Sequence, residues 1–320
     1  MTQDSTTVSN YDLDEVKSNF DLLLDNFQKK IKEFRPRSDI KKTKLWKYKK
    51  KLNDIDSLNS INKIKLMSII IRYNSLNNLF NENISLSYSN KVFIKLVEGD
   101  AEYDDRDQEY NDTFFELSMA VRFLQPSKEK VNVNLLTDCD IVIDETLAIE
   151  CKYLHSEKSA KERITEGIRQ VQRRVEDGIA KIGIVSIDIS FIFDDDKFNN
   201  LILSVFNDFY CNYKKTFDLD DYFLIKEIVL DRNFNKICSS LINHHSEFFI
   251  ISLLSDDIYS KMTKEVLGIT YQVQSQLMFQ KEDILLPVPY RMMSYKLNPA
   301  LSDEEQLSVK KLIHSLTHKI

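Results

Sequence analysis

The sequence predicts an α/β protein whose mixed sheet lies between helices, preceded by an all-helical region. Three observations support this prediction. Apolar residues recur at helical spacing over 11–35, 61–76 and 112–124. Two short apolar runs, 139–143 and 147–154, flank a three-residue turn from Asp144 to Thr146, as in a hairpin. Beyond them, helical and β-branched segments alternate, which is the element order of an α/β fold.

The first 108 residues are expected to form a helical region. A helix over 11–35 carries Phe20, Leu23, Leu24, Phe27, Ile31 and Phe34 on its apolar face. Residues 35–51 then hold nine lysines and arginines and one acid, with Trp46 and Tyr48 interleaved. Residues 98–109 reverse the sign, with seven acids and Arg106 alone, which predicts an exposed linker and a domain boundary.

Residues 109–320 are expected to form the α/β domain, with its core at 110–255. A helix from Asp112 ends before Pro126, and the hairpin strands at 139–143 and 147–154 follow. Next come a helix carrying Ile164, Ile168, Val171 and Val175, a buried strand over 182–193, helices over 196–212 and 232–244, and strands over 248–254 and 270–278. A final helix starts at Ser302, where Ser302 and Glu305 have the spacing of a capping box.

Composition excludes several functional classes. With only five glycines, the chain has neither a Rossmann fingerprint nor a phosphate-binding P-loop. Its four cysteines are scattered, which argues against a disulfide framework or a structural zinc site. No apolar run approaches the length needed to cross a membrane, and the N-terminus does not have the pattern of a secretory signal. We therefore expect a cytoplasmic protein with reduced thiols and no membrane partner.

The hairpin carries two carboxylates and a lysine in a pattern typical of a catalytic site. Glu150 and Lys152 share one face of the second strand, because side chains alternate along a strand. With an odd-numbered turn, Asp140 lies directly opposite Glu150. Two facing carboxylates repel each other unless a cation lies between them, and carboxylate and carbonyl oxygens suit Mg²⁺. Lys152 could orient or deprotonate an attacking water and neutralise charge in the transition state. Together these groups predict a phosphodiester hydrolase.

Asp140, a hairpin, and then Glu150-Cys151-Lys152 resemble the PD-(D/E)xK nuclease superfamily, over roughly residues 110–195. The resemblance implies a restriction-endonuclease-like fold and Mg²⁺, with Mn²⁺ as a substitute. The metal would be held by Asp140, Glu150 and the backbone carbonyl of Cys151. The preceding helix would supply a further acid, Glu116, as a catalytic group and ligand. The sequence departs from the family pattern at Cys139, because the pattern has a proline at the position before Asp140.

The resemblance also implies a glutamine on the helix after the hairpin, and two candidates are present. Gly167-x-x-Gln170 fits a pattern of some members, whereas helical geometry favours Gln172, which flanks the apolar stripe. His155 follows the motif closely and could approach the site, although a lone histidine at a strand end is more often incidental.

The expected function is therefore Mg²⁺-dependent endonucleolytic cleavage of DNA, in defence against foreign DNA or in DNA processing, by a homodimer or larger assembly. Two alternatives keep the fold: a ribonuclease that uses the same site, and a non-catalytic scaffold whose N-terminal helices dock a protein. A third is a solvent-facing hairpin in which Lys152 pairs with Asp138 or Asp140. The basic segment 35–51 could contact nucleic acid, pair with the acidic run 98–109, or dock a partner.

Overall fold

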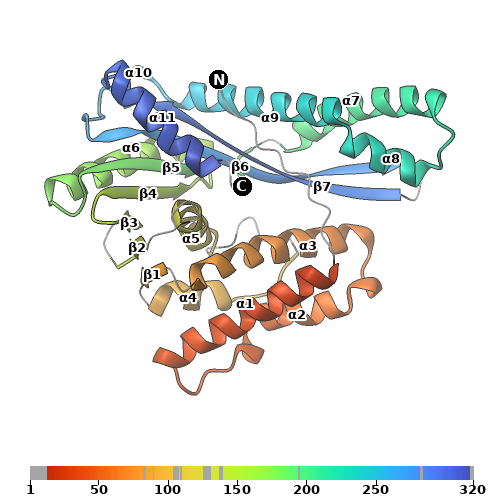
Figure 1. Cartoon of the computed structure of the whole chain (residues 1–320), viewed down its shortest axis with the longest axis horizontal. Helices are drawn as coiled ribbons and strands as arrows, with labels where there is room; N and C mark the ends of the chain where they lie inside the picture. The colour runs from red at the N-terminus through yellow and green to blue at the C-terminus, as the bar shows by residue number, and fades with distance from the viewer. Residues whose placement is uncertain are drawn as a thin grey trace.

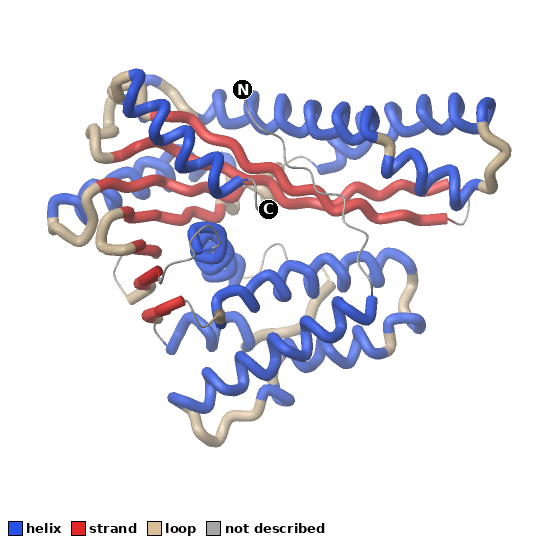
Figure 2. The backbone as a smooth tube through the Cα atoms, in the orientation of Figure 1, coloured by secondary structure: helices blue, strands red, loops and turns tan. Residues whose placement is uncertain are grey.

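The structure is a computed structural model that describes residues 13–81, 84–88, 90–103, 108, 110–124, 131–136, 140–193, 195–281 and 284–317. This part of the chain contains eleven α-helices and one seven-stranded mixed sheet, so the predicted α/β class is confirmed. The sheet runs between a layer of helices above it and the N-terminal helices below it in Figure 2. In the described ranges, no helix combines the length and the apolar character needed to span a membrane.

The strands follow one another across the sheet in chain order. They are Ile84–Ser87 (β1), Val131–Asn134 (β2), Ile141–Ile143 (β3), Leu147–Tyr153 (β4), Ile182–Asp188 (β5), Val266–Lys281 (β6) and Ile284–Leu297 (β7). The pairs β1/β2, β4/β5 and β5/β6 are parallel, and β2/β3, β3/β4 and β6/β7 are antiparallel. The β6–β7 hairpin continues past the end of β5 at Asp188, where α8 packs against β7.

The helices form two groups on opposite sides of the sheet (Figure 1). The first group is Leu13–Phe34 (α1), Lys44–Asn53 (α2), Ser60–Asn74 (α3), Asn90–Val97 (α4) and Tyr110–Leu124 (α5). The second is Glu157–Glu176 (α6), Asp195–Thr216 (α7), Asp221–Leu230 (α8), Arg232–Leu253 (α9) and Asp256–Tyr259 (α10). The last helix, Asp303–Thr317 (α11), packs against β7 and α5, and its Val309 and Ile313 belong to the same hydrophobic cluster as the first group. The contacts of α5 with β4, and of α6 with β4 and β5, place these two helices on either side of the hairpin.

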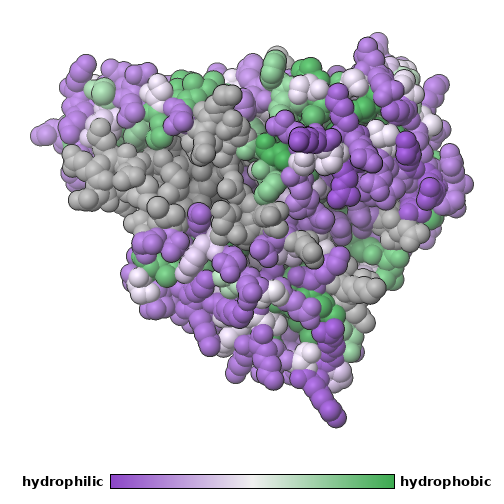
Figure 3. Space-filling view, turned by 180° about the vertical axis from the view of Figure 1, so that it is seen from behind, coloured by the Kyte–Doolittle hydropathy of each residue, from purple (hydrophilic) through white to green (hydrophobic). Residues whose placement is uncertain are grey.

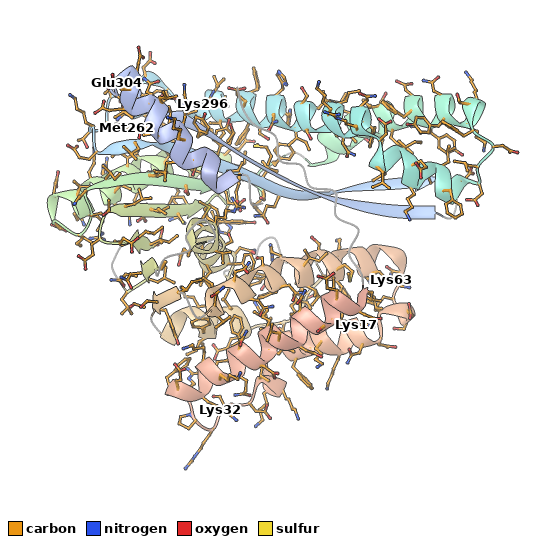
Figure 4. The ribbon with its side chains drawn as sticks, viewed as in Figure 1. Lys17, Lys32, Lys63, Met262, Lys296 and Glu304 are labelled. Carbon is orange, nitrogen blue, oxygen red and sulfur yellow. The ribbon has the colours of Figure 1, made fainter. Side chains whose placement is uncertain are left out.

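The sheet separates two large hydrophobic clusters, one on each face. One joins the buried faces of α1–α5 to Ile149 and Cys151 of β4, so the N-terminal helices and the sheet share a continuous core. The other joins α6–α10 to Val185 and Ile187 of β5. The odd-numbered residues of β4 therefore face α5, and its even-numbered residues face α6. At the far end of the sheet, Lys296 (labelled in Figure 4) reaches Glu247 of α9 at 2.5 Å.

Two glycines allow α6 to lie close to the sheet. A Cβ atom at Gly183 of β5 would overlap Val171 of α6 and come within 2.8 Å of the Ala148 carbonyl oxygen. A Cβ atom at Gly167 of α6 would lie 3.0 Å from Val185 and 3.5 Å from Cε of Lys152. The two contacts at Gly183 and the contact of Gly167 with Val185 are tighter than ordinary van der Waals packing, so larger side chains would push the helix outward.

The strand predicted at 248–254 is wrong: these residues end α9, which extends the predicted helix 232–244 to Leu253. Ile250 is buried there while Phe248 and Ile251 are exposed, which is helical rather than alternating burial. The strand predicted over 182–193 ends at Asp188, and that predicted over 270–278 lies within the longer β6. The capping box is confirmed, because Ser302 and Glu305 exchange side-chain-to-backbone hydrogen bonds.

The described part of the surface carries scattered large hydrophobic side chains that are exposed. Seen from behind, it is largely hydrophilic with separate hydrophobic patches (Figure 3). Phe217, Leu219 and Phe223 near the junction of α7 and α8 are among the exposed ones. Residues 125–130 and 137–139, which include Pro126, Asp138 and Cys139, lie outside the described part of the chain.

Candidate active site

The turn between β3 and β4 sets the register of the candidate site. Asp144, Glu145 and Thr146 connect the strands, and Ile141 pairs with Ile149. Asp144 and Glu145 adopt left-handed backbone conformations, with φ of 48° and 53°. The odd-numbered turn is thus confirmed. The next residues away from the turn are Asp140, just before β3, and Glu150 in β4.

The backbone of β4 holds the side chain of Asp140 in place. Its Oδ2 accepts a hydrogen bond of 2.7 Å from the Cys151 amide, which brings the carboxylate beside Glu150. Burial raises the pKa of Asp140 well above its usual range, and the charges of Glu150 and Glu116 add to this effect. The Cys151 N–H and the Lys152 ammonium act in the opposite direction, but less strongly.

Glu150 and Lys152 form a buried ion pair. The Lys152 Nζ lies 2.8 Å from Glu150 Oε1, and the two side chains are 10% and 2% exposed. Burial lowers the pKa of Lys152, but Glu150 and Asp140 outweigh it and the net shift is upward. Glu150 Oε2 is buried and has no hydrogen-bond partner. The solvent-facing hairpin is therefore excluded, and the partner of Lys152 is Glu150 rather than Asp140.

Glu116 approaches this pair from α5. Burial raises its pKa to about 7, Lys95 opposes the shift, and Asp112 and Glu150 add to it. The charge of Glu116 also raises the pKa of Asp140, so the three carboxylates interact electrostatically. Within the described ranges, however, no three acidic, histidine or cysteine side chains gather closely enough to hold a metal ion. The structure thus brings Glu116 near the site without assembling a three-carboxylate ligand group.

The residues of the hairpin fit Mg²⁺ with two protein carboxylates. Asp140 and Glu150 are hard oxygen donors, and the partnerless Oε2 of Glu150 supplies a buried acceptor that a cation would satisfy. Mg²⁺ keeps several water ligands and needs only one or two carboxylates. The Cys151 carbonyl remains a predicted ligand.

The two glutamines lie in different surroundings. Gln172 donates a 2.6 Å hydrogen bond from Nε2 to the Lys261 carbonyl, which ties α6 to the segment after α10. Gln170 has a buried Oε1 without a hydrogen-bond partner, one turn beyond Gly167, which packs on Lys152. Which glutamine belongs to the site therefore stays a prediction: helical spacing favours Gln172, whereas the bond to Lys261 engages the Gln172 amide away from the hairpin.

Several neighbours of the site were not predicted. The charge of Lys95 on α4 lowers the pKa of Glu116, and the charge of Glu166 on α6 raises the pKa of Lys152. Asp112 shares a helix face with Glu116 at a spacing of four residues, a signal that could have identified it from sequence. No sequence pattern indicates Lys95, because it reaches the site through the packing of α4 on α5.

The basic segment pairs with the acidic run, which confirms one of its predicted alternatives. Arg35 bonds Glu98 at 3.1 Å, and Lys47 bonds Asp100 at 2.9 Å. Lys51 donates to the Ala101 carbonyl at 2.6 Å. The positive charge of this segment is thus largely directed at the protein itself.

We compared the chain with protein-family models, curated proteins and solved structures, and found no match in any of the three. The function of the protein must therefore be inferred from the residues of the site.

Proposed function

We propose that the chain is a metal-dependent nuclease of the PD-(D/E)xK type, with a restriction-endonuclease-like fold, that hydrolyses DNA phosphodiesters with Mg²⁺. One observation carries the proposal: Asp140 accepts a hydrogen bond from the Cys151 amide, beside the buried ion pair of Glu150 and Lys152. The resemblance of the motif to this superfamily extends the proposal to a dimeric or larger enzyme of defence or DNA processing.

Each side chain has a defined task in this reaction. Asp140 and Glu150 would hold the metal together with the Cys151 carbonyl. A bound Mg²⁺ would polarise the phosphodiester and acidify a water. Lys152 has an ammonium group within reach of Glu150, where it can orient the attacking water and neutralise charge on the phosphoryl oxygens. Glu116, which approaches Glu150 from α5, can accept a hydrogen bond from that water.

The test is cleavage by the purified full chain. Supercoiled plasmid, linear duplex, single-stranded DNA and RNA are each incubated with Mg²⁺, Mn²⁺ or EDTA. We expect metal-dependent cutting of DNA that Glu150→Gln and Lys152→Met reduce by at least about 10³-fold. Glu145→Gln is the matched control, because Glu145 is an exposed carboxylate on the same hairpin. Wild-type rates in both site variants would refute the proposal.

Thermal unfolding separates the alternatives. Mn²⁺ at about 100 times its Kd should stabilise the wild type and Glu145→Gln by about 2.7 kcal/mol, but not Glu150→Gln. RNA cleavage that depends on Glu150 would make the chain a ribonuclease, since the motif acts on the phosphodiester rather than on the sugar. Neither stabilisation nor cleavage would favour the scaffold.

A further inference from the structure

The N-terminal helical group carries a concentration of positive charge around the end of α1. Residues 29–51 hold twelve lysines and arginines and only two acids, Glu33 and Asp39. Lys30 pairs with Glu33, and the carboxylate of Asp39 accepts the backbone amide of Lys41. The acids of this segment therefore neutralise only a small part of its charge, although the whole chain has a net charge of −6.

Helix α2 contacts the acidic run on one side and α1 on the other. Lys47 and Lys51 bond to the acidic run, as described above. On the other side, Lys49 pairs with Asp21 of α1. The ring of Trp46 lies on this second side, with its centroid 5.1 Å from Lys49 Nζ. The acidic run thus covers one side of α2 and leaves the charge beside α1 uncovered.

The segment between α1 and α2 is fastened to α1 by Gln28. The Gln28 amide donates to the Ser38 carbonyl at 3.1 Å and accepts from the Ile40 amide at 2.8 Å. Asp21, Gln28 and Lys32 share one face of α1, because spacings of seven and four residues return to the same side of a helix. The segment therefore lies beside Lys32, which is at the lower edge of the molecule in Figure 4.

Four exposed cations of these elements have no ion-pair partner within the ranges that the structure describes, and we call them the basic surface: Lys32, Arg37, Lys42 and Lys50. Lys41, also exposed, lies with its Nζ 5.7 Å from the ring centroid of Trp46. Residues 29–51 are all described, and they expose no large hydrophobic side chain. The surface thus offers positive charge without the apolar centre of a typical protein interface.

We propose that the basic surface binds the phosphate backbone of nucleic acid; this inference rests on the proposed nuclease function, because the nucleic acid is its substrate. Unpaired cations gathered on one side of an acidic protein match a polyanion, which releases its condensed counterions when lysines replace them. Phosphate contacts position a polynucleotide without reading its sequence. The surface lies on the N-terminal helices, below the sheet in Figure 1, so it holds substrate away from the cleaved bond.

The test is binding of the full chain to a labelled DNA duplex of mixed sequence in EDTA, followed by fluorescence anisotropy over a range of salt concentrations. Combining Lys32→Gln, Lys42→Gln and Lys50→Gln should weaken binding about 10²-fold at about 0.1 M salt. The slope of log K against log salt should fall by about 2.7, since each phosphate contact contributes about 0.9. Trp46 is the only tryptophan, so its emission should change on binding in the wild type and not in this variant.

A matched control removes the same number of charges from other elements. Lys215, Lys236 and Lys310 are exposed lysines of α7, α9 and α11. Combining Lys215→Gln, Lys236→Gln and Lys310→Gln changes the net charge equally, so it separates the basic surface from the overall charge of the protein. This control should bind the duplex as tightly as the wild type.

Three results would overturn the inference: unchanged affinity in the basic-surface variant, an equal loss in the control, or a wild type that does not bind the duplex at low salt. Cleavage of DNA with Mg²⁺ would uphold the nuclease in each case, because binding is measured separately in EDTA. Conversely, binding that depends on the basic surface, in a protein that cuts no nucleic acid, would support the surface and refute the proposed function.

Discussion

Lys47 and Asp100 form an ion pair of 2.9 Å on the surface, where their side chains are 53% and 78% exposed. Lys152 and Glu150 form a pair of nearly the same length, 2.8 Å, with only 10% and 2% exposed. The surface pair gains little, because water already solvates both ions. The buried pair has lost that solvation, so each partner depends strongly on the other.

The balance of charge also differs between the two regions. The basic segment and the acidic run meet cation to anion, as in Arg35 with Glu98. Around the hairpin, the carboxylates of Glu116, Asp140 and Glu150 outnumber the nearby ammonium groups of Lys95 and Lys152. Excess negative charge in a poorly solvated place is costly to maintain unless another cation or a proton binds. The distance between the charged atoms thus does not distinguish the two ion pairs; burial and charge imbalance do.

The largest expected effect comes from removing the buried cation. Lys152→Met should lower the free energy of unfolding by about 3 kcal/mol at pH 8, because it leaves Glu150 and Asp140 charged and poorly solvated. The loss should shrink at pH 5, where Asp140, whose pKa is raised, takes up a proton more readily. Urea unfolding of the metal-free protein measures it. Lys47→Met should leave the unfolding midpoint almost unchanged. Equal losses of stability in the two variants would contradict the difference between the buried and the surface ion pair.

An effect of similar size is expected from Glu116. Its pKa is raised from 4.5 to about 7 on folding, so the folded state binds more protons than the unfolded chain between these values. Its contribution is fully present below about pH 4.5 and disappears as pH rises through about 7, a change of about 3 kcal/mol. Glu116→Gln should match the wild type near pH 4.5 and be more stable at pH 8. Parallel stability profiles for the two proteins would contradict the assignment.

The smallest effect separates the two glutamines. Gln170→Leu should reduce cleavage about 10-fold, because its buried amide lies on the turn of α6 after Gly167. Gln172→Leu should leave the cleavage rate unchanged and slightly lower the unfolding temperature, since it loses only the bond to the Lys261 carbonyl. Steady-state cleavage of one duplex substrate compares them, and the reverse ranking would identify Gln172 as the site residue.

The sequence predicted the hairpin well because its determinants are local. Alternation along β4 and a three-residue turn are enough to bring Asp140 and Glu150 into register. Helix α1 and the capping box at Ser302 were predicted for the same reason, from short-range spacing. The acidic run was also expected to be exposed, as Glu98 and Asp100 are.

The missed features depend on contacts between distant segments. The run 248–254 is rich in residues that favour strands, and only its packing as the end of α9 decides the outcome. Strand β7 contains Pro287 and Pro289, which argue against a strand unless it lies at an edge, as β7 does among the described strands. The choice between Gln170 and Gln172 depends on the orientation of α6 on the sheet, which no local pattern contains.

Gly167 and Gly183 have a consequence for Lys152. Since bare backbone at these positions lets α6 settle on the strands, the clearance between helix and sheet determines how much room the lysine stem has. A methyl group at Gly167 would crowd Val185 at 3.0 Å and lie at an ordinary 3.5 Å from Cε of Lys152, while changing no charge. The reach of the ammonium group therefore depends on the spacing between the helix and the sheet, which an uncharged substitution at Gly167 can alter.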